Sequence, residues 1–398
     1  MDKDNWMTIR FYVLASSFLF LTGCATDLTD AEADISNASE TAEVAEIGNG
    51  QGGPEGEGMQ MQSEPKDSII DIVEESAENN TTESKSEAEL AEAFLDTLTD
   101  DEKEQVSYDF TEENAAHWSN LPANSQNRNG VALGDLSEES VEAALTLAKA
   151  SLSEQGYETM LNIIRADEFL TTDTGRTEWG SGLYYIAILG EPSDTDTWML
   201  QISGHHLAEN IVFNGEEVSA TPQFTGTEPQ TFELNGTTLA PIETRRKGMY
   251  SIIESLDEDQ LAEAKIDEEF RDVVVGADSD GEFPEESEGI LYSDLSEEQQ
   301  ELVKTAIKAW MEDAEEDTAQ GLLDVYLSDD ALAETYIGWS GSTNYDDVGS
   351  YVRIDGPRLW LEFASQQGVG YNSGEDAEAH FHTVWRDKLA DYGGAFSE

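Results

Sequence analysis

The chain has 398 residues, of which 86 are acidic and 20 are basic, so its formal net charge at neutral pH is −66. A surface this acidic repels nucleic acids and anionic lipid headgroups, which argues against both as binding partners. Because salt screens the mutual repulsion of the acids, we expect a salt-rich, marine or halophilic habitat. The single cysteine, Cys24, excludes a disulfide within the chain and a cysteine-based metal site in the folded part.

The N-terminus has the pattern of a bacterial lipoprotein signal. An uncharged apolar run at residues 11–22 is shorter than the roughly 20 apolar residues that a membrane-spanning helix needs, and it fits a signal peptide. It ends in Leu21-Thr22-Gly23-Cys24, which resembles the lipobox of bacterial lipoproteins. The resemblance implies that residues 1–23 are cleaved and that Cys24 carries lipid. We therefore expect an extracytoplasmic protein, anchored through Cys24 to the outer membrane or the cell surface.

The segment after the cysteine has the composition of an unfolded chain. Residues 25–85 contain no Trp, Tyr, Phe, His or Arg and are rich in Glu, Ser, Asn, Gly and Thr. Such a segment cannot bury enough apolar surface to offset the entropy that it would lose on ordering. We predict a disordered acidic tether at residues 24–85 and one globular domain at residues 86–398.

Four segments of the globular region begin with the signature of a helix N-terminus. In each, an apolar residue precedes Ser, Thr or Asp, and acidic residues fill the first turn, where the helix dipole favours negative charge. Three of the four also have Glu or Gln three residues after the cap, as in a capping box. We predict a helix after each of these capping residues, which are Thr99, Ser137, Asp257 and Ser296.

Strands are predicted between the helices. Asn214-Gly215 is a strong signal for a two-residue hairpin between two of them. Apolar and β-branched residues bounded by turn signals mark the strands at residues 183–189, 197–203, 208–213 and 216–220.

A longer pattern occurs twice. Residues 185–190 are echoed at 336–341, and residues 201–204 are echoed at 353–356, each copy downstream of a capped helix. The sequence therefore predicts an α+β fold with a mixed or antiparallel sheet and flanking helices. In this interpretation, two related helix-plus-hairpin halves form one domain.

Two of the five histidines lie in a segment with strand-like alternation, residues 378–385. Residues i and i+2 of a strand face the same side, so His380 and His382 project together, with Phe381 and Trp385 on the other side. Two imidazoles on one face are a common metal-binding arrangement.

A second pair, His205-His206, follows Gly204 at the end of a predicted strand. Adjacent strand residues point in opposite directions, so only one joins a shared site unless the backbone turns, which Gly204 permits. Three or four imidazoles without a thiolate suit Zn, Cu, Fe or Ni, with copper or zinc expected first. Three protein ligands would leave a position open for water or a substrate.

Other polar residues lie in the C-terminal stretch that contains His380 and His382. Glu362 and Asp387 are candidates for a further ligand, for a partner behind a ligand, or for a base. Arg386 lies in the same stretch as Arg353 and Arg358, and these arginines can bind a small anionic ligand or pair with acids of the chain. The alternative to a metal site is an acid–histidine network that stabilises the sheet in a non-catalytic binding or scaffold lipoprotein.

Six segments resemble an uncharacterised family known as domain of unknown function 3500. The resemblance runs from about residue 86 to the end, and it departs at Lys388, where proline is expected. It implies that the histidine motifs are regular features of the domain and not peculiar to this chain, but it implies no activity. The matching segments are residues 118–122, 152–157, 204–210, 221–226, 351–357 and 380–387.

Overall fold

A twelve-stranded sheet organises the part of the chain that the computed structural model describes, which is residues 66–78, 85–123, 128–372 and 377–396. Two short strands pair beside its main path, β2 (Val131–Ala132) with β3 and β6 (Glu217–Ser219) with β5. A separate hairpin joins β8 (Phe232–Leu234) to β9 (Thr237–Leu239). In spatial order the main path is β1 (Ser107–Tyr108), β3 (Tyr185–Leu189), β4 (Trp198–Gly204), β5 (Leu207–Asn214), β7 (Gln223–Thr227), β14 (Ala379–Asp387), β13 (Leu359–Gln367), β12 (Tyr351–Asp355), β11 (Tyr336–Ser340) and β10 (Ile290–Leu291).

The sheet is mixed, because β1 pairs with β3 in parallel while its other described pairs are antiparallel. The α+β prediction is therefore confirmed. Strands β3, β4, β5 and β7 form one antiparallel set, strands β11 to β14 form another, and the sets join where β14 pairs with β7. The relatedness of the two sets as copies of one unit stays a prediction.

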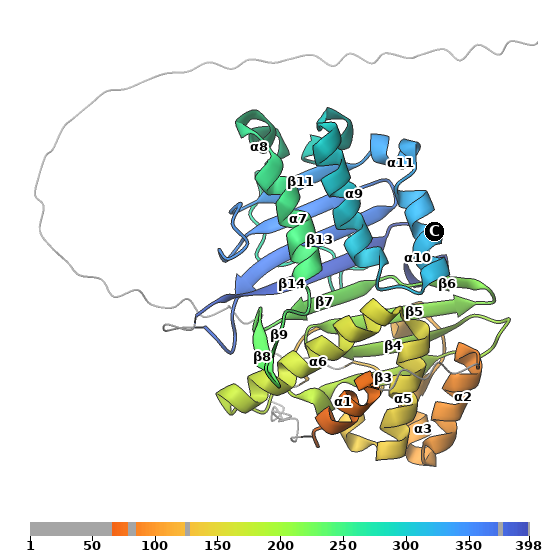
Figure 1. Cartoon of the computed structure of the whole chain (residues 1–398). Coiled ribbons are helices and arrows are strands. Elements are labelled where there is room, and N and C mark those ends of the chain that lie inside the picture. The colour runs from red at the N-terminus through yellow and green to blue at the C-terminus, as the bar shows by residue number, and fades with distance from the viewer. Residues whose placement is uncertain (1–65, 79–84, 124–127, 373–376, 397–398) are drawn as a thin grey trace, which may run out of the picture. The chain divides into compact units, whose positions relative to one another are not determined.

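Helices cover one face of this sheet, with α5 and α6 over the strands of the first set and α7 and α9 over those of the second (Figure 1). Each of the four predicted caps accepts a hydrogen bond from its first helical turn, and three close a reciprocal capping box. The helices are α1 (Ile70–Glu78), α2 (Glu87–Thr97), α3 (Asp100–Val106), α4 (Glu112–Ala115), α5 (Glu138–Ser151), α6 (Glu154–Thr174), α7 (Glu243–Ser255), α8 (Glu258–Ala264), α9 (Glu297–Met311), α10 (Glu316–Tyr326) and α11 (Asp329–Ala333).

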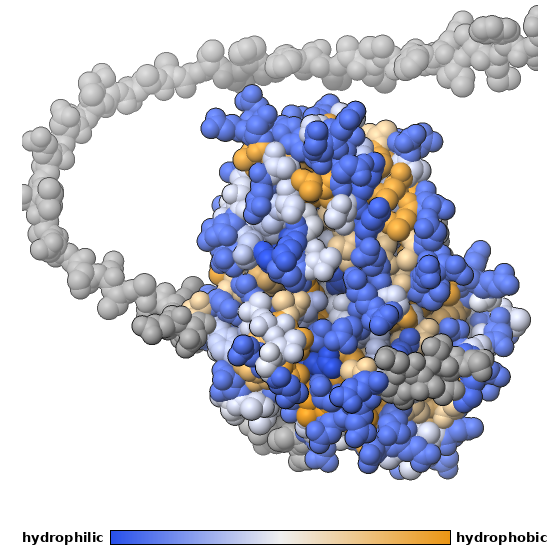
Figure 2. Space-filling model, viewed as in Figure 1, coloured by the Kyte–Doolittle hydropathy of each residue, from blue (hydrophilic) through white to orange (hydrophobic). Residues whose placement is uncertain are grey.

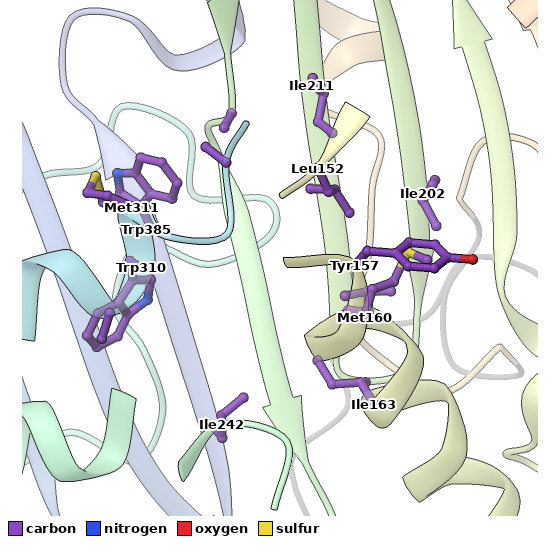
Figure 3. Close-up of a cluster of buried hydrophobic side chains, with 14 of the residues drawn as sticks. Leu152, Tyr157, Met160, Ile163, Ile202, Ile211, Ile242, Trp310, Met311 and Trp385 are labelled. Carbon is purple, nitrogen blue, oxygen red and sulfur yellow. The ribbon is translucent and has the colours of Figure 1, made fainter. Parts of the chain in front are cut away.

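The main hydrophobic core lies between these helices and the sheet (Figure 3). Met160 and Ile163 of α6 pack there with Ile202 and Ile211 of the sheet, and Trp385 of β14 belongs to the same cluster. Trp385 has no exposed surface. Replacing a buried tryptophan by alanine removes its apolar contacts and leaves a cavity, which costs about 3–5 kcal/mol. This core fixes which side of β14 faces the helices.

The opposite face of the sheet is covered largely by irregular chain. A second cluster forms there from Phe224 and Val384 of the sheet together with Trp118, Val275 and Tyr392 of the covering segments. The Nε1 atom of Trp118 donates a hydrogen bond to the Tyr392 hydroxyl at 2.9 Å. One of the covering segments connects α8 to β10, at residues 265–289. It carries part of the candidate site.

The ordered region begins before residue 86, which corrects the predicted domain boundary. Helix α1 belongs to the predicted tether, yet Val73 is buried and Ile69 is 4% exposed in the main core. Residues 69–73, Ile-Ile-Asp-Ile-Val, supply enough apolar surface to dock the helix, although the composition around them is acidic. Residues 1–65, including Cys24, lie outside the described residues.

Hydrophilic side chains predominate on the helical face of the domain, as the acidic composition leads one to expect (Figure 2). Within the residues that the structure describes, no helix combines the length and the apolar character needed to cross a membrane.

Candidate metal centre

His205 and His206 form the two-residue turn between β4 and β5, since Gly204 pairs directly with Leu207. The backbone of His206 has a φ of 64°, in the left-handed region that histidine enters more readily than most residues. A side chain at Gly204 would collide with the Tyr184 ring, so glycine is required where the strand ends. The turn brings the two imidazoles together, with ring centroids 3.7 Å apart.

His380 and His382 project from the same face of β14, as predicted. Their Nε2 atoms are 3.1 Å apart, and both side chains are buried. Phe381 and Trp385 point to the other face and pack in the main core. The alternation of β14 therefore directs both imidazoles away from the helices.

Strand β7 brings the two histidine pairs together, because it pairs with β5 on one side and with β14 on the other. Gly226 lies between the pairs, and its N–H donates a 2.7 Å hydrogen bond to the carbonyl oxygen of His206. A Cβ atom at position 226 would stand 3.0 Å from the His206 ring and 3.1 Å from the His382 ring. The absence of a side chain at Gly226 thus makes room for the imidazoles.

Three of the four rings have the spacing of ligands around one ion. The centroid of His206 lies 5.2 Å from that of His380 and 5.1 Å from that of His382, and the last two are 4.7 Å apart. Nitrogen ligands about 2.1 Å from a tetrahedral ion hold their ring centroids about 5 Å apart. Ligand nitrogens of these three residues also lie within 4.8 Å of one another. His205 is not part of this group of three.

Two carboxylates that sequence reasoning missed hold two of the imidazoles. Asp272 Oδ1 is 2.8 Å from Nδ1 of His382, and Asp167 Oδ1 is 2.8 Å from Nδ1 of His205. A carboxylate on one ring nitrogen orients a histidine and makes its other nitrogen a better ligand. Asp272 comes from the irregular segment 265–289 and Asp167 from α6, so only the tertiary fold shows these pairings.

Burial favours the neutral form of two imidazoles of the cluster, His206 and His380. Burial lowers the pKa of His206 well below its ordinary value, and the charges of the neighbouring histidines lower it further. The same causes, burial first and His382 next, lower the pKa of His380 to about 2. Neutral imidazole is the form that binds metals. The Nε2 atom of His206 is buried and has no hydrogen-bond partner among the described residues. Because buried polar atoms are normally satisfied, this nitrogen is a candidate metal ligand.

Glu362 and Arg386 lie behind the site and do not contact its histidines. Glu362 accepts hydrogen bonds from the backbone N–H groups of Val274 and Val275, at 2.6 and 3.0 Å. Arg386 donates to the carbonyl oxygens of Val275 and Gly276, at 2.9 and 2.6 Å. Both side chains therefore anchor the segment that carries the Asp272 carboxylate.

Asp387 lies on the other face of β14, away from the histidines. It accepts a 2.7 Å hydrogen bond from the Tyr326 hydroxyl of α10 and pairs with Arg358. Arg353 pairs with Glu288, and Arg386 pairs with Asp280. The three arginines named as candidates for binding a small anion thus pair with acids of the chain itself.

A family model for proteins of unknown function, DUF3500, matches residues 80–394. The match confirms the resemblance found in the sequence and covers both histidine pairs. No curated protein and no solved structure gives a significant match to this chain. The chain belongs to the DUF3500 family, whose description gives no activity.

Proposed function

We propose that this protein binds a transition metal ion through His206, His380 and His382, with copper or zinc as the first candidates. The observation that carries the proposal is the spacing of three buried rings, 4.7 to 5.2 Å between centroids, in a cluster without thiolates. Imidazole donors suit Zn, Cu, Fe and Ni, and the Asp272 carboxylate supports His382 as it would in a metal site.

Three protein ligands leave a fourth position for water or a substrate. Such an ion can act as a Lewis acid or lower the pKa of bound water, so hydrolytic and oxidative chemistry are both compatible with this donor set. The four histidine side chains are, however, all buried. A catalytic role would therefore require this end of the sheet to open.

We place this centre in an extracytoplasmic lipoprotein. The support is the lipobox at residues 21–24 and the apolar run before it, both outside the described residues. In this proposal, lipid on Cys24 anchors the protein to the membrane. The net charge of −66 supports a salt-rich habitat and disfavours nucleic acid as a partner.

The second candidate function is a non-catalytic binding or scaffold lipoprotein in which the histidines are structural. The hydrogen bonds from His205 to Asp167 and from His382 to Asp272 favour it, because buried acid–histidine pairs also stabilise folds without metal. The two functions differ in their response to metal. A metal ion that binds only the folded state raises the melting temperature, whereas a purely structural network is insensitive to it.

The deciding experiment measures metal bound to the full mature chain, produced without a histidine tag and purified in high salt. We expect about one equivalent or more of copper or zinc by mass spectrometry, and its loss in a His380→Ala/His382→Ala variant. His117→Ala is the matched control, because His117 stands apart from the cluster and hydrogen-bonds Asn129. Failure to bind copper, zinc, iron or nickel after reconstitution, with no metal dependence of the melting temperature, would establish the structural alternative.

A further inference from the structure

His205, the fourth histidine of the cluster, has a carboxylate partner of its own, Asp167. The His205 ring stacks on His206 at 3.7 Å and on Trp179 at 5.9 Å, and His205 does not belong to the group of three histidines that the first ion would join. Its Nδ1 atom instead faces Asp167 at 2.8 Å. Ligand atoms of Asp167, His205 and His206 lie within 4.8 Å of one another.

One oxygen of the buried Asp167 carboxylate is incompletely hydrogen-bonded within the described residues. The residue is 1% exposed and its Oδ1 atom meets His205, while its Oδ2 atom accepts no hydrogen bond of good geometry from the described residues, although the Tyr184 hydroxyl lies nearby. A buried carboxylate is normally paired, hydrogen-bonded or bound to a metal, because transfer of its charge from water is costly. The orphaned oxygen points to a cation or another donor that completes this site.

A second buried carboxylate, Glu228, lies against the same helix. Its Oε1 atom accepts hydrogen bonds from the N–H groups of Gly370 and Tyr371, at 2.8 and 2.9 Å, while Oε2 has no partner among the described residues. A Cβ atom on Gly370 would touch both this carboxylate and Leu170 of α6, which follows Asp167 by about one turn. Two incompletely satisfied carboxylates beside an imidazole form a locally negative, buried donor set.

We propose that Asp167, His205 and His206 bind a second transition metal ion, with Glu228 as the nearby compensating charge. The inference rests on the proposed function, because His206 would join the two centres by giving one ring nitrogen to each ion. Its remaining ring proton is then released to solvent. The donor set of two imidazoles and a carboxylate suits copper, zinc or iron. The protein would thus hold a binuclear centre in which the first ion has three histidine ligands.

The test loads the metal-free full chain with Cu(II) and counts bound ions by mass spectrometry. We expect two equivalents in the wild type and one in Asp167→Asn. Asp173→Asn is the control on the same helix, since Asp173 is more exposed and accepts only from the Tyr371 hydroxyl among described partners. Because one imidazole bridges the ions, the electron paramagnetic resonance signal of the first Cu(II) should fall when the second equivalent enters.

The outcomes separate this inference from the function on which it rests. No copper in the wild type overturns both. One equivalent that is lost in His380→Ala/His382→Ala supports the first centre and overturns the second. If Asp167→Asn fails to fold, His205→Phe decides, because phenylalanine preserves stacking on His206 and Trp179 while removing both ring nitrogens. Two equivalents retained in His205→Phe would overturn the second centre.

Discussion

Asp272 and His382 are joined by a 2.8 Å contact across 110 residues of sequence. Burial by itself would raise the pKa of the Asp272 carboxyl, but His382, the backbone N–H of Val273 and Gln366 together outweigh it, and the pKa is lowered. The carboxylate therefore stays ionised and keeps the Nδ1 proton of His382 in place. The Nε2 atom of His382, which lies 3.1 Å from Nε2 of His380, is then the atom that faces the proposed ion.

Replacing Asp272 by asparagine should weaken metal binding about 10- to 100-fold, the usual effect of losing a carboxylate behind a histidine ligand. The fold should survive, because the Asp272 side chain is 44% exposed. Competition with a chromophoric chelator measures the affinity. Asp267→Asn, an exposed change in the same irregular segment, is the control. Unchanged affinity in Asp272→Asn would show that Asp272 does not support a ligand.

Replacing Glu362 by glutamine should lower both stability and metal affinity. Glu362 also accepts hydrogen bonds from the Tyr351 hydroxyl and the Trp360 Nε1 atom, at 2.6 and 2.8 Å, beside those from the irregular segment. An amide cannot accept from all four donors, so we expect a loss of about 2–4 kcal/mol in the free energy of unfolding, measured in urea. The released segment carries Asp272, so metal affinity falls with it.

The control for this change is Glu282→Gln, an exposed acid in the same covering segment. A Glu362→Gln variant that is destabilised but binds metal as tightly as the wild type would contradict the role of the anchor in positioning Asp272.

A buried acid on β5 should give the fold a measurable pH dependence. Burial, with the nearby Asp313 charge, raises the pKa of Glu209 from 4.5 to about 8. Between these values the unfolded chain loses the proton while the folded chain retains it. The free energy of unfolding therefore falls as the pH rises through this window, by up to about 1.4 kcal/mol per pH unit from this group.

Glu209→Gln removes this group, so its stability relative to the wild type should increase from pH 5 to pH 8 by an amount on the order of a few kcal/mol. Urea unfolding of both proteins at constant ionic strength measures the difference. Glu217→Gln changes an exposed acid on the adjoining strand β6 and should leave the pH dependence of the wild type intact. Parallel pH curves for wild type and Glu209→Gln would show that Glu209 is ionised in the fold.

Replacing Cys24 by serine should release the protein from the membrane. The sulfur is the attachment point implied by the lipobox, and serine offers no thioether. Wild-type protein expressed in a bacterial host should partition into the detergent phase of Triton X-114, and Cys24→Ser into the aqueous phase. Mass spectrometry of the mature N-terminus provides the second readout. Equal partitioning of the two proteins, with no lipid on Cys24, would refute the anchor.

Local patterns in the sequence were enough for four helix starts, for several strands and for half of the site. The caps at Thr99 and Ser296 identified helix starts because the interactions involved span three residues. The alternation around His380 and His382 placed both rings on one face for the same local reason. The turn at His205 and His206 was left open, since the direction of adjacent side chains depends on a backbone φ that composition does not encode.

The carboxylate partners of the histidines, the orientation of Asp387 and helix α1 could be found only from the tertiary structure. Asp167 and Asp272 stand in a long helix and an irregular segment, where nothing local distinguishes them from the other acids of so acidic a chain. Asp387 looked like a neighbour of the site because it follows His382 in sequence, but strand alternation points it to the opposite face. Helix α1 was missed because four apolar residues were averaged with an acidic surrounding segment.

The two strand sets of the sheet meet only where β7 pairs with β14 among the described strands, and the histidines stand on both sides of that junction. His206 belongs to the set that contains β4 and β5, whereas His380 and His382 belong to β14. An ion held by all three would cross-link chain segments that are far apart in sequence, and closing a long loop in this way reduces the entropy of the unfolded chain. The two sets would then melt as one cooperative unit when the ion is bound and could separate more easily without it.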